Sequence, residues 1–210
     1  MFSTIPLRHS VLPQTIPLCF ILTGFLPVMS IVLHCTGVLS LQHCALFLIL
    51  PLVALSLILG LRDTGTGRVA LRGWVAGIFA VALYDLSRLP FLFSGWSDFI
   101  PKIGGWLAME DHPVAWLGYL WRYIGNGGGL GMVYFILLYI FGASRYFLRS
   151  GLAFGLFVFV CLQLVLLTFD EAQAMMFPLN WLTFSGSLTG HVVYGLSLGW
   201  VGRRGVGKRK

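Results

Sequence analysis

Charged residues are scarce in this chain. Only 10% of its 210 residues are Asp, Glu, Lys or Arg, whereas soluble domains average about 25%. Hydrophobic residues make up 58% of the sequence, and the mean hydropathy is +0.88. Such a composition cannot cover a water-exposed surface, which excludes a soluble fold. The apolar runs show no alternation of period two, which also excludes a transmembrane β-barrel.

Motifs of the common enzyme classes are also missing. The sequence has no zinc-protease helix. Its glycine run, Gly125-Asn126-Gly127-Gly128-Gly129, is not followed by Lys-Ser/Thr, so it is not a Walker loop. A dinucleotide fingerprint would require a preceding strand, whereas this run lies in an apolar span. We therefore expect a protein that is not an enzyme.

Long apolar runs are abundant. A helix that crosses a bilayer needs about 20 mostly apolar residues. Six segments meet this requirement: residues 12–33, 41–61, 73–93, 114–141, 151–169 and 185–201. The fourth is long enough to tilt or to carry an irregular turn. The sequence therefore predicts an all-α integral membrane protein with six transmembrane helices, the first of which we expect to be retained rather than cleaved.

Basic residues are concentrated in alternate connections. They precede the first span, lie between spans two and three and between spans four and five, and form the tail, whereas Lys102 is the one basic residue of the opposite loops. By the positive-inside rule, both termini are expected to be cytoplasmic. The pI of about 9.6 then reflects topology rather than nucleic-acid binding. The predicted organisation is an N-terminal hairpin (1–61), a basic cytoplasmic loop (62–72), a four-helix core (73–202) and a basic cytoplasmic tail (203–210).

Four of the spans carry two glycines four residues apart, a spacing that allows close approach of helix backbones in a membrane. The pairs are Gly73/Gly77, Gly127/Gly131, Gly151/Gly155 and Gly195/Gly199. The segments "LRGWVAGIFAV" and "LRSGLAFGLFVF" are also similar to each other, which predicts two copies of one helical hairpin. In this register Asp85 corresponds to Gln163.

Ionisable residues inside the spans are the main candidates for a site, because each is costly to place in a membrane. From the rise per residue of a helix, polar side chains of several spans are expected at a similar depth in the membrane, here termed the polar level. They are Asp85, Arg88, Arg122, Gln163 and His191. We expect Asp85 to pair with Arg122 or Arg88. The cluster is either a pocket for an anion, a proton or a lipid headgroup, or an ion pair that locks the helices; in a third interpretation both arginines reach out to headgroups.

Two other clusters are candidate ligand sets. Two His-Cys dipeptides, His34-Cys35 and His43-Cys44, flank the turn between spans one and two. Imidazole and thiolate suit copper or zinc, and a histidine pair can ligate haem iron; the alternative is structural packing. A divalent cation or a solvated acidic face would explain the acidic residues of the outer loops: Glu110, Asp111, His112, Asp170 and Glu171.

From residue 73 onward, three segments carry a family resemblance: "GWVAGIFAVALYD", "GGGLGMVYFILLY" and "GHVVYGLSLG". On these motifs the chain resembles a group of small, functionally uncharacterised bacterial inner-membrane proteins with a glycine-rich four-helix core. The resemblance implies a location in the bacterial inner membrane and no established activity. The group tends to show a histidine in its second core helix, where this chain has Trp121-Arg122-Tyr123.

Three functions are compatible with these features. The first is an accessory or scaffold subunit that packs in a larger membrane complex and contacts lipids. The second is a small transporter or channel that uses the polar level as its site. A haem- or metal-binding subunit, acting through the turn between His34 and His43, is the third and more distant interpretation.

Overall fold

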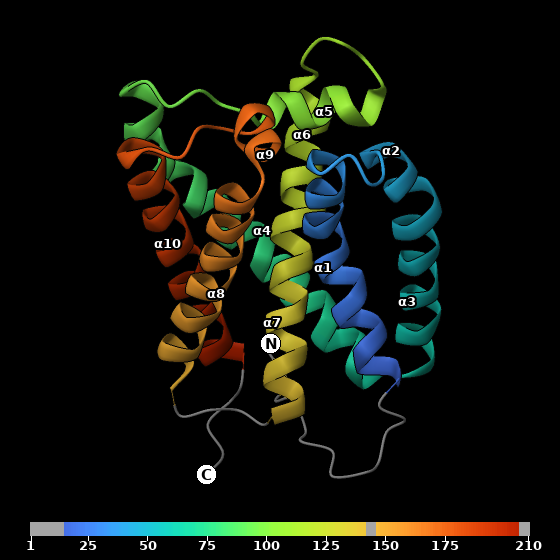
Figure 1. Ribbon diagram of the computed structural model, residues 1–210. Helices are drawn as coiled ribbons and strands as arrows, with labels where there is room; N and C mark the ends of the chain where they lie inside the picture. Colours follow the sequence, from blue (N-terminus) through green and yellow to red (C-terminus); the bar gives the residue numbers. More distant parts are fainter. Residues whose placement is uncertain (1–14, 142–145, 206–210) are drawn as a thin grey trace.

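The computed structural model describes residues 15–141 and 146–205, and Figure 1 shows their arrangement. The fold is 86% helical, and the described part contains no strand. Basic residues that contributed to the predicted orientation lie partly outside these ranges: Arg8, Arg145, Lys208, Arg209 and Lys210.

Six long helical segments run along the molecule. Two of them contain a π-helical stretch, in which each turn is wider than in an α-helix. The segments are α1 (Thr15–Cys35), α2–η1–α3 (Leu41–His43, Cys44–Ile49 and Leu50–Arg62), α4 (Thr64–Phe93), α6–η2–α7 (Ala115–Leu120, Trp121–Gly127 and Gly128–Phe141), α8 (Phe147–Thr168) and α10 (Trp181–Gly205). Two short helices, α5 (Ile100–Ala108) and α9 (Asp170–Met175), lie at one end of the bundle, here termed the α5 end.

In the described part, five of these segments are long and apolar enough to cross a membrane. They coincide with the first five predicted spans and indicate a multi-pass membrane protein. The sixth predicted span forms α10 but is not among the five. Its many Ser, Thr and Gly residues lower its hydropathy, so the number of six spans stays a prediction.

The expected loop at residues 62–72 is wrong, because the polypeptide turns there over one residue. Asp63 separates α3 from α4, and its carboxylate accepts hydrogen bonds from the backbone N–H groups of Gly65 (3.1 Å) and Thr66 (3.3 Å). A side chain that satisfies the free N–H groups of the first turn allows a helix to begin immediately. The predicted loop therefore forms the first two turns of α4.

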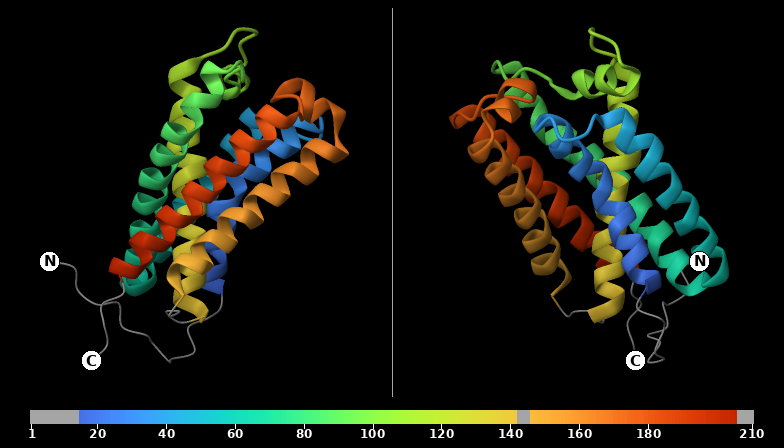
Figure 2. Two further views of the ribbon diagram at one scale, coloured as in Figure 1. Left: turned by 90° about the vertical axis from the view of Figure 1, so that its left-hand side faces the viewer. Right: turned by 45° about the vertical axis from the view of Figure 1, so that its right-hand side comes forward.

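The four glycine-bearing segments pack as two hairpins. In the first, α4 lies against η2–α7, and in the second, α8 lies against α10; Figure 2 shows α8 and α10 running side by side. A Cβ atom on Gly77 would overlap the carbonyl oxygen of Gly127, and one on Gly155 would overlap that of His191. Small residues thus permit close backbone approach in both hairpins.

The two hairpins pack in the same register. A Cβ atom on Gly73 would meet the carbonyl of Gly131, and a Cβ atom on Gly151 would meet that of Gly195. The contacts of the two hairpins therefore follow the same order along the helices, and their origin as two copies of one unit stays a prediction. In addition, α10 packs against α4, whereas α1 packs against α7 and α3 covers α1 and α4.

Candidate functional site

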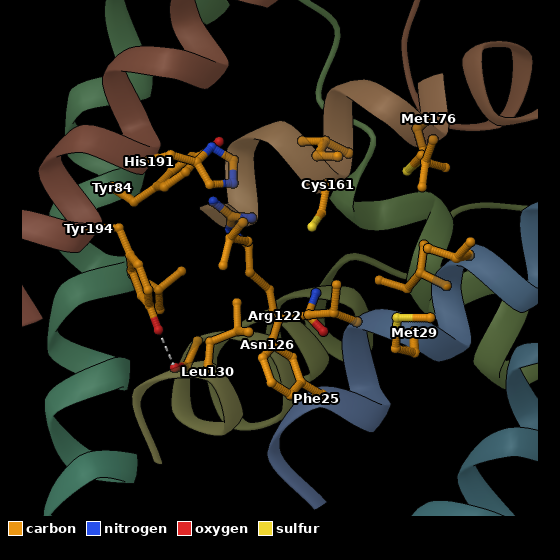
Figure 3. A pocket seen from close by; sticks show the side chains of 18 of the residues that line it. Phe25, Met29, Tyr84, Arg122, Asn126, Leu130, Cys161, Met176, His191 and Tyr194 are labelled. Carbon is orange, nitrogen blue, oxygen red and sulfur yellow. Dashed lines mark hydrogen bonds between the residues drawn. The ribbon is translucent and has the colours of Figure 1, made fainter. Parts of the chain in front are cut away.

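A cavity of about 640 Å³ lies between α1 and the two hairpins (Figure 3). Its volume is within the range of about 300–1,000 Å³ that is usual for small-molecule sites. Its walls come from α1, α4, η2–α7, α8 and α10, and residues next to α5 and α9 cover its α5 end.

Most of the cavity wall is hydrocarbon. Phe25 and Val28 of α1 line it on one side, and Val158 and Leu162 of α8 on the other. At its edge, three large apolar lining residues are exposed on the outside of the bundle: Met29, Phe157 and Leu164. The cavity therefore borders the apolar side of the helices, where acyl chains would lie around a membrane protein.

The guanidinium of Arg122 lies at the polar end of the cavity (Figure 3). Its Nε is 2.8 Å from Oδ1 and 3.0 Å from Oδ2 of Asp85, and its Nη2 donates a further hydrogen bond to Oδ1. The guanidinium carbon also lies 4.7 Å from the centre of the Tyr84 ring. The predicted pair of Asp85 with Arg122 is therefore present, and within the described residues Nη1 makes no hydrogen bond.

His191 of α10 lies next to Arg122 at this end of the cavity (Figure 3). Its Nδ1 is 2.7 Å from the carbonyl oxygen of Ser187. Because a carbonyl can only accept, Nδ1 must carry the proton and Nε2 must present a lone pair. In the part of the chain that the structure describes, Nε2 has no hydrogen-bond partner. His191 thus offers an unused acceptor beside the unused donor of Arg122.

The π-helical segment η2 forms the floor of this polar end. Two of its carbonyls accept hydrogen bonds from neighbouring helices: Ile124 from Trp74 Nε1 (3.0 Å) and Gly127 from Tyr194 Oη (2.8 Å; dashed in Figure 3). Asn126 of the same segment lines the cavity, and its Oδ1 is buried without a partner among the described residues. Isolated π turns are frequent at functional sites, and this one supplies both Arg122 and Asn126.

Arg88 does not join this cluster. Its Nη2 is 2.8 Å from Oδ1 of Asp98, in the connection after α4, and Oδ2 of Asp98 accepts a hydrogen bond from Tyr119 (2.7 Å). Arg88 lies one helical turn nearer the α5 end than Asp85, so its long side chain reaches this connection. It forms a second ion pair, which holds α4, α6 and the residues before α5 together.

Gln163 is buried but does not line the cavity, so the structure separates it from the other predicted members of the cluster. Within the described ranges, neither its Oε1 nor its Nε2 has a hydrogen-bond partner. The reason lies in the register of the hairpins. Gln163 follows Gly155 by eight residues, as Asp85 follows Gly77, but Gly186 occupies the position that corresponds to Arg122.

The His-Cys turn is well ordered by other contacts. His34 packs on Trp106 with ring centres 4.7 Å apart, and the Nδ1 of His43 hydrogen-bonds the Ser40 hydroxyl at 2.5 Å. Cys35 and Cys44 are buried free thiols. The described residues contain no group of three or more metal-ligating side chains, so a metal or haem role for this turn stays a prediction.

The acidic residues of the outer loops form one contact that the structure records. Nδ1 of His112 lies 3.7 Å from Glu110, and both side chains are exposed. Asp170 and Glu171 form the first turn of α9. Over residues 15–141 and 146–205, these side chains are not gathered into a metal-ligating group, and the proposed cation stays a prediction.

Fold and cavity together define a class, a multi-pass α-helical membrane protein with an intramembrane cavity that is apolar along its walls and polar at one end. Comparisons with protein-family models, with curated proteins and with solved structures found no match.

Sequence reasoning missed three residues of this region. Asn126 was considered only as part of the glycine run, although a lone amide in an apolar span is itself a signal of a site. Tyr194 lies within a quoted motif, but its partner, a backbone carbonyl, leaves no mark in the sequence. Asp98 lies in a connection, and the sequence does not show that this connection folds back to pair Asp98 with Arg88.

Proposed function

We propose that this chain is a non-enzymatic membrane protein that holds a lipid-like molecule in the cavity between α1 and α8, as an accessory subunit of a membrane assembly. One observation carries the proposal: an apolar cavity of about 640 Å³ borders the exposed faces of α1 and α8 and ends at Arg122, Asn126 and His191.

A molecule from the bilayer fits this cavity better than a water-soluble one. The exposed side chains at its edge, Met29, Phe157 and Leu164, are all apolar. A hydrocarbon chain would bury them without desolvating any charge, whereas a polar solute would lose its hydration along most of the wall. The polar end would then fix the orientation of the head group, as a few placed polar groups do in most ligand sites.

Exposed apolar surface elsewhere supports the accessory role. Few residues of the η1–α3 segment are buried, and its exposed residues include Phe47, Leu57 and Leu61. Such a face suits lipid or the helices of another subunit. By the distribution of basic residues, we propose that the α5 end faces outward and both termini face the cytoplasm. A bacterial inner membrane is proposed from the motif resemblance alone.

Native mass spectrometry of the protein purified in a mild detergent tests the proposal. Cys161 lines the cavity (Figure 3), and Val160, its neighbour on α8, is exposed and does not line it. We expect the wild type and Val160→Trp to retain a bound amphiphile, and Cys161→Trp to lose it because the indole fills the space. An empty wild type, or equal retention by both variants, would contradict ligand binding in this cavity.

A small transporter is the second candidate, favoured by the polar groups that the cavity wall carries inside the bundle, Arg122 and Asn126. Vesicles that contain the protein and a fluorescent phospholipid separate the two functions. If a membrane-impermeant reductant bleaches the inner-leaflet dye faster than in empty vesicles, the protein moves lipid. Equal rates would leave the accessory role as the proposed function.

A further inference from the structure

The polar end of the cavity is built for an uncharged head group. Of the described residues that line the cavity, Arg122 is the one with a permanent charge, and Asp85 neutralises it. Arg122 is 8% exposed. A carboxylate or phosphate bound here would be a third buried charge without a partner of its own, which is strongly unfavourable in a low dielectric. An ammonium group would lie beside the guanidinium and be repelled.

The unused hydrogen-bonding groups specify the head group further. Nη1 of Arg122 is a donor without an acceptor, and Nε2 of His191 is an acceptor without a donor, among the described residues. A hydroxyl can satisfy both, because it donates one hydrogen bond and accepts others. An ester or ketone offers acceptors alone and would leave Nε2 of His191 unpaired.

We propose that the cavity binds a long-chain amphiphile with a neutral hydroxyl head, such as a long-chain alcohol or a monoacylglycerol. The inference rests on the proposed function, lipid binding in this cavity, and adds the chemistry of the head group. The hydroxyl donates to His191 Nε2 and accepts from Arg122 Nη1. Asn126 Oδ1, buried and unpartnered in the described part of the chain, accepts from a second hydroxyl where the head carries one.

Competition photolabelling tests this chemistry. The probe is a hexadecanol with a diazirine in its chain, cross-linked to the full-length protein in lipid nanodiscs, with the labelled residues mapped by mass spectrometry. Competitors are 1-monopalmitoylglycerol, palmitic acid and methyl palmitate, which share one chain length and differ in the head. Label is expected on cavity residues such as Phe25 and Leu130.

We expect monopalmitoylglycerol to compete at concentrations about tenfold lower than the acid or the ester. The acid and the ester leave a buried acceptor unsatisfied, which is unfavourable, and tenfold in affinity corresponds to about 1.4 kcal/mol. Asn126→Leu should reduce the advantage of monopalmitoylglycerol over plain hexadecanol. Gln163→Leu removes another buried amide, one that does not line the cavity, and should leave every ratio unchanged.

His191→Phe is the sharpest variant, because it removes the acceptor and keeps an aromatic ring against Tyr84. In this variant the ester should compete as well as the alcohol. If His191→Phe does not fold, the wild-type competition series decides the question by itself.

The outcomes separate the two proposals. Equal competition by alcohol, acid and ester, with label in the cavity, would overturn the hydroxyl head group and leave lipid binding intact. Stronger competition by palmitic acid would point to an anionic ligand and overturn the inference as well. Label that is absent from the cavity residues would overturn both the head group and the proposed function.

Discussion

The two glycine-packed hairpins share a register and differ in their polar residues. In α4 and η2–α7, Asp85 and Arg122 form an ion pair at the cavity. In α8 and α10, Gln163 and Gly186 occupy the corresponding positions. A Cβ atom on Gly186 would lie 2.8 Å from the rings of Phe91 and Trp96, so aromatic side chains fill the space of the missing arginine.

The glycine contacts that the hairpins share form the scaffold, and the polar residues in which they differ form the site. Glycine contacts place the helices in both hairpins, and they do so whatever polar residues lie farther along. The first hairpin supplies the charged end of the cavity and the π-helical turn, and the second supplies the apolar wall formed by α8 together with His191. The position of His191 corresponds to that of Gly127, so the imidazole enters where the first hairpin has no side chain.

The largest loss of stability is expected when a packing glycine is replaced by leucine, and the loss should be equal in the two hairpins. A leucine at Gly77 or Gly155 has no room, because even a Cβ atom there overlaps a backbone carbonyl. Each variant should lose about 3 kcal/mol of stability, the upper end of the usual cost of overpacking. Gel filtration in detergent should then show less monodisperse protein. Val75→Leu, on the exposed face of α4, is the control and should behave as wild type.

A difference between Gly77→Leu and Gly155→Leu would contradict equal packing of the two hairpins. Tolerance in the second hairpin alone would mean that its helices separate without loss of the fold, and that the shared register is not what holds both hairpins together.

The polar residues should distinguish the hairpins. Asp85→Leu leaves the Arg122 charge buried and unpaired, which costs about 3–5 kcal/mol, whereas Gln163→Leu removes two unpartnered polar atoms. Thermal unfolding in detergent should therefore show a clearly lowered Tm for Asp85→Leu and an unchanged or raised Tm for Gln163→Leu. The double variant Asp85→Leu/Arg122→Leu should recover most of the lost stability. Equal losses for Asp85→Leu and Gln163→Leu would contradict the distinction.

Much of the scaffold could be predicted from the sequence, and less of the site. Hydropathy located the long helices to within a few residues except at the start of α4, and the glycine pairs indicated the packing of both hairpins. The similar depth of the charged residues in their spans was sufficient to predict an ion pair of Asp85 with Arg122 or Arg88. Arg88 was grouped with them because helix rise places residues along an axis but does not tell where a connection folds, and the partner of Arg88, Asp98, lies in such a connection.

Cavities are harder to predict, because they arise from side chains of five segments that meet only in the folded protein. The sequence around the run 125–129 does not show that a π-helix forms there. It therefore does not show that Asn126 and Arg122 line the same cavity. The start of α4 at Thr64 was not predicted, because the basic residues of this segment suggested a loop. The helix begins there because Asp63 caps it.

The smallest effect is expected at the contact between the hairpins. Tyr194→Phe removes the hydrogen bond from α10 to the Gly127 carbonyl, which should cost about 0.5–1.5 kcal/mol. Tyr139→Phe is the matched control, since its hydroxyl makes no hydrogen bond that the described structure records. Chemical unfolding curves of the two variants should differ in midpoint. Coincident curves would mean that this bond adds nothing to the contact between hairpins.

The most direct measurement is an experimental density map of the protein purified without delipidation. Our prediction is elongated density between α1 and α8 that ends within hydrogen-bonding distance of Arg122 Nη1 and His191 Nε2. A map in which α8 packs directly on α1 and leaves no cavity would contradict it, and so would an open cavity without such density.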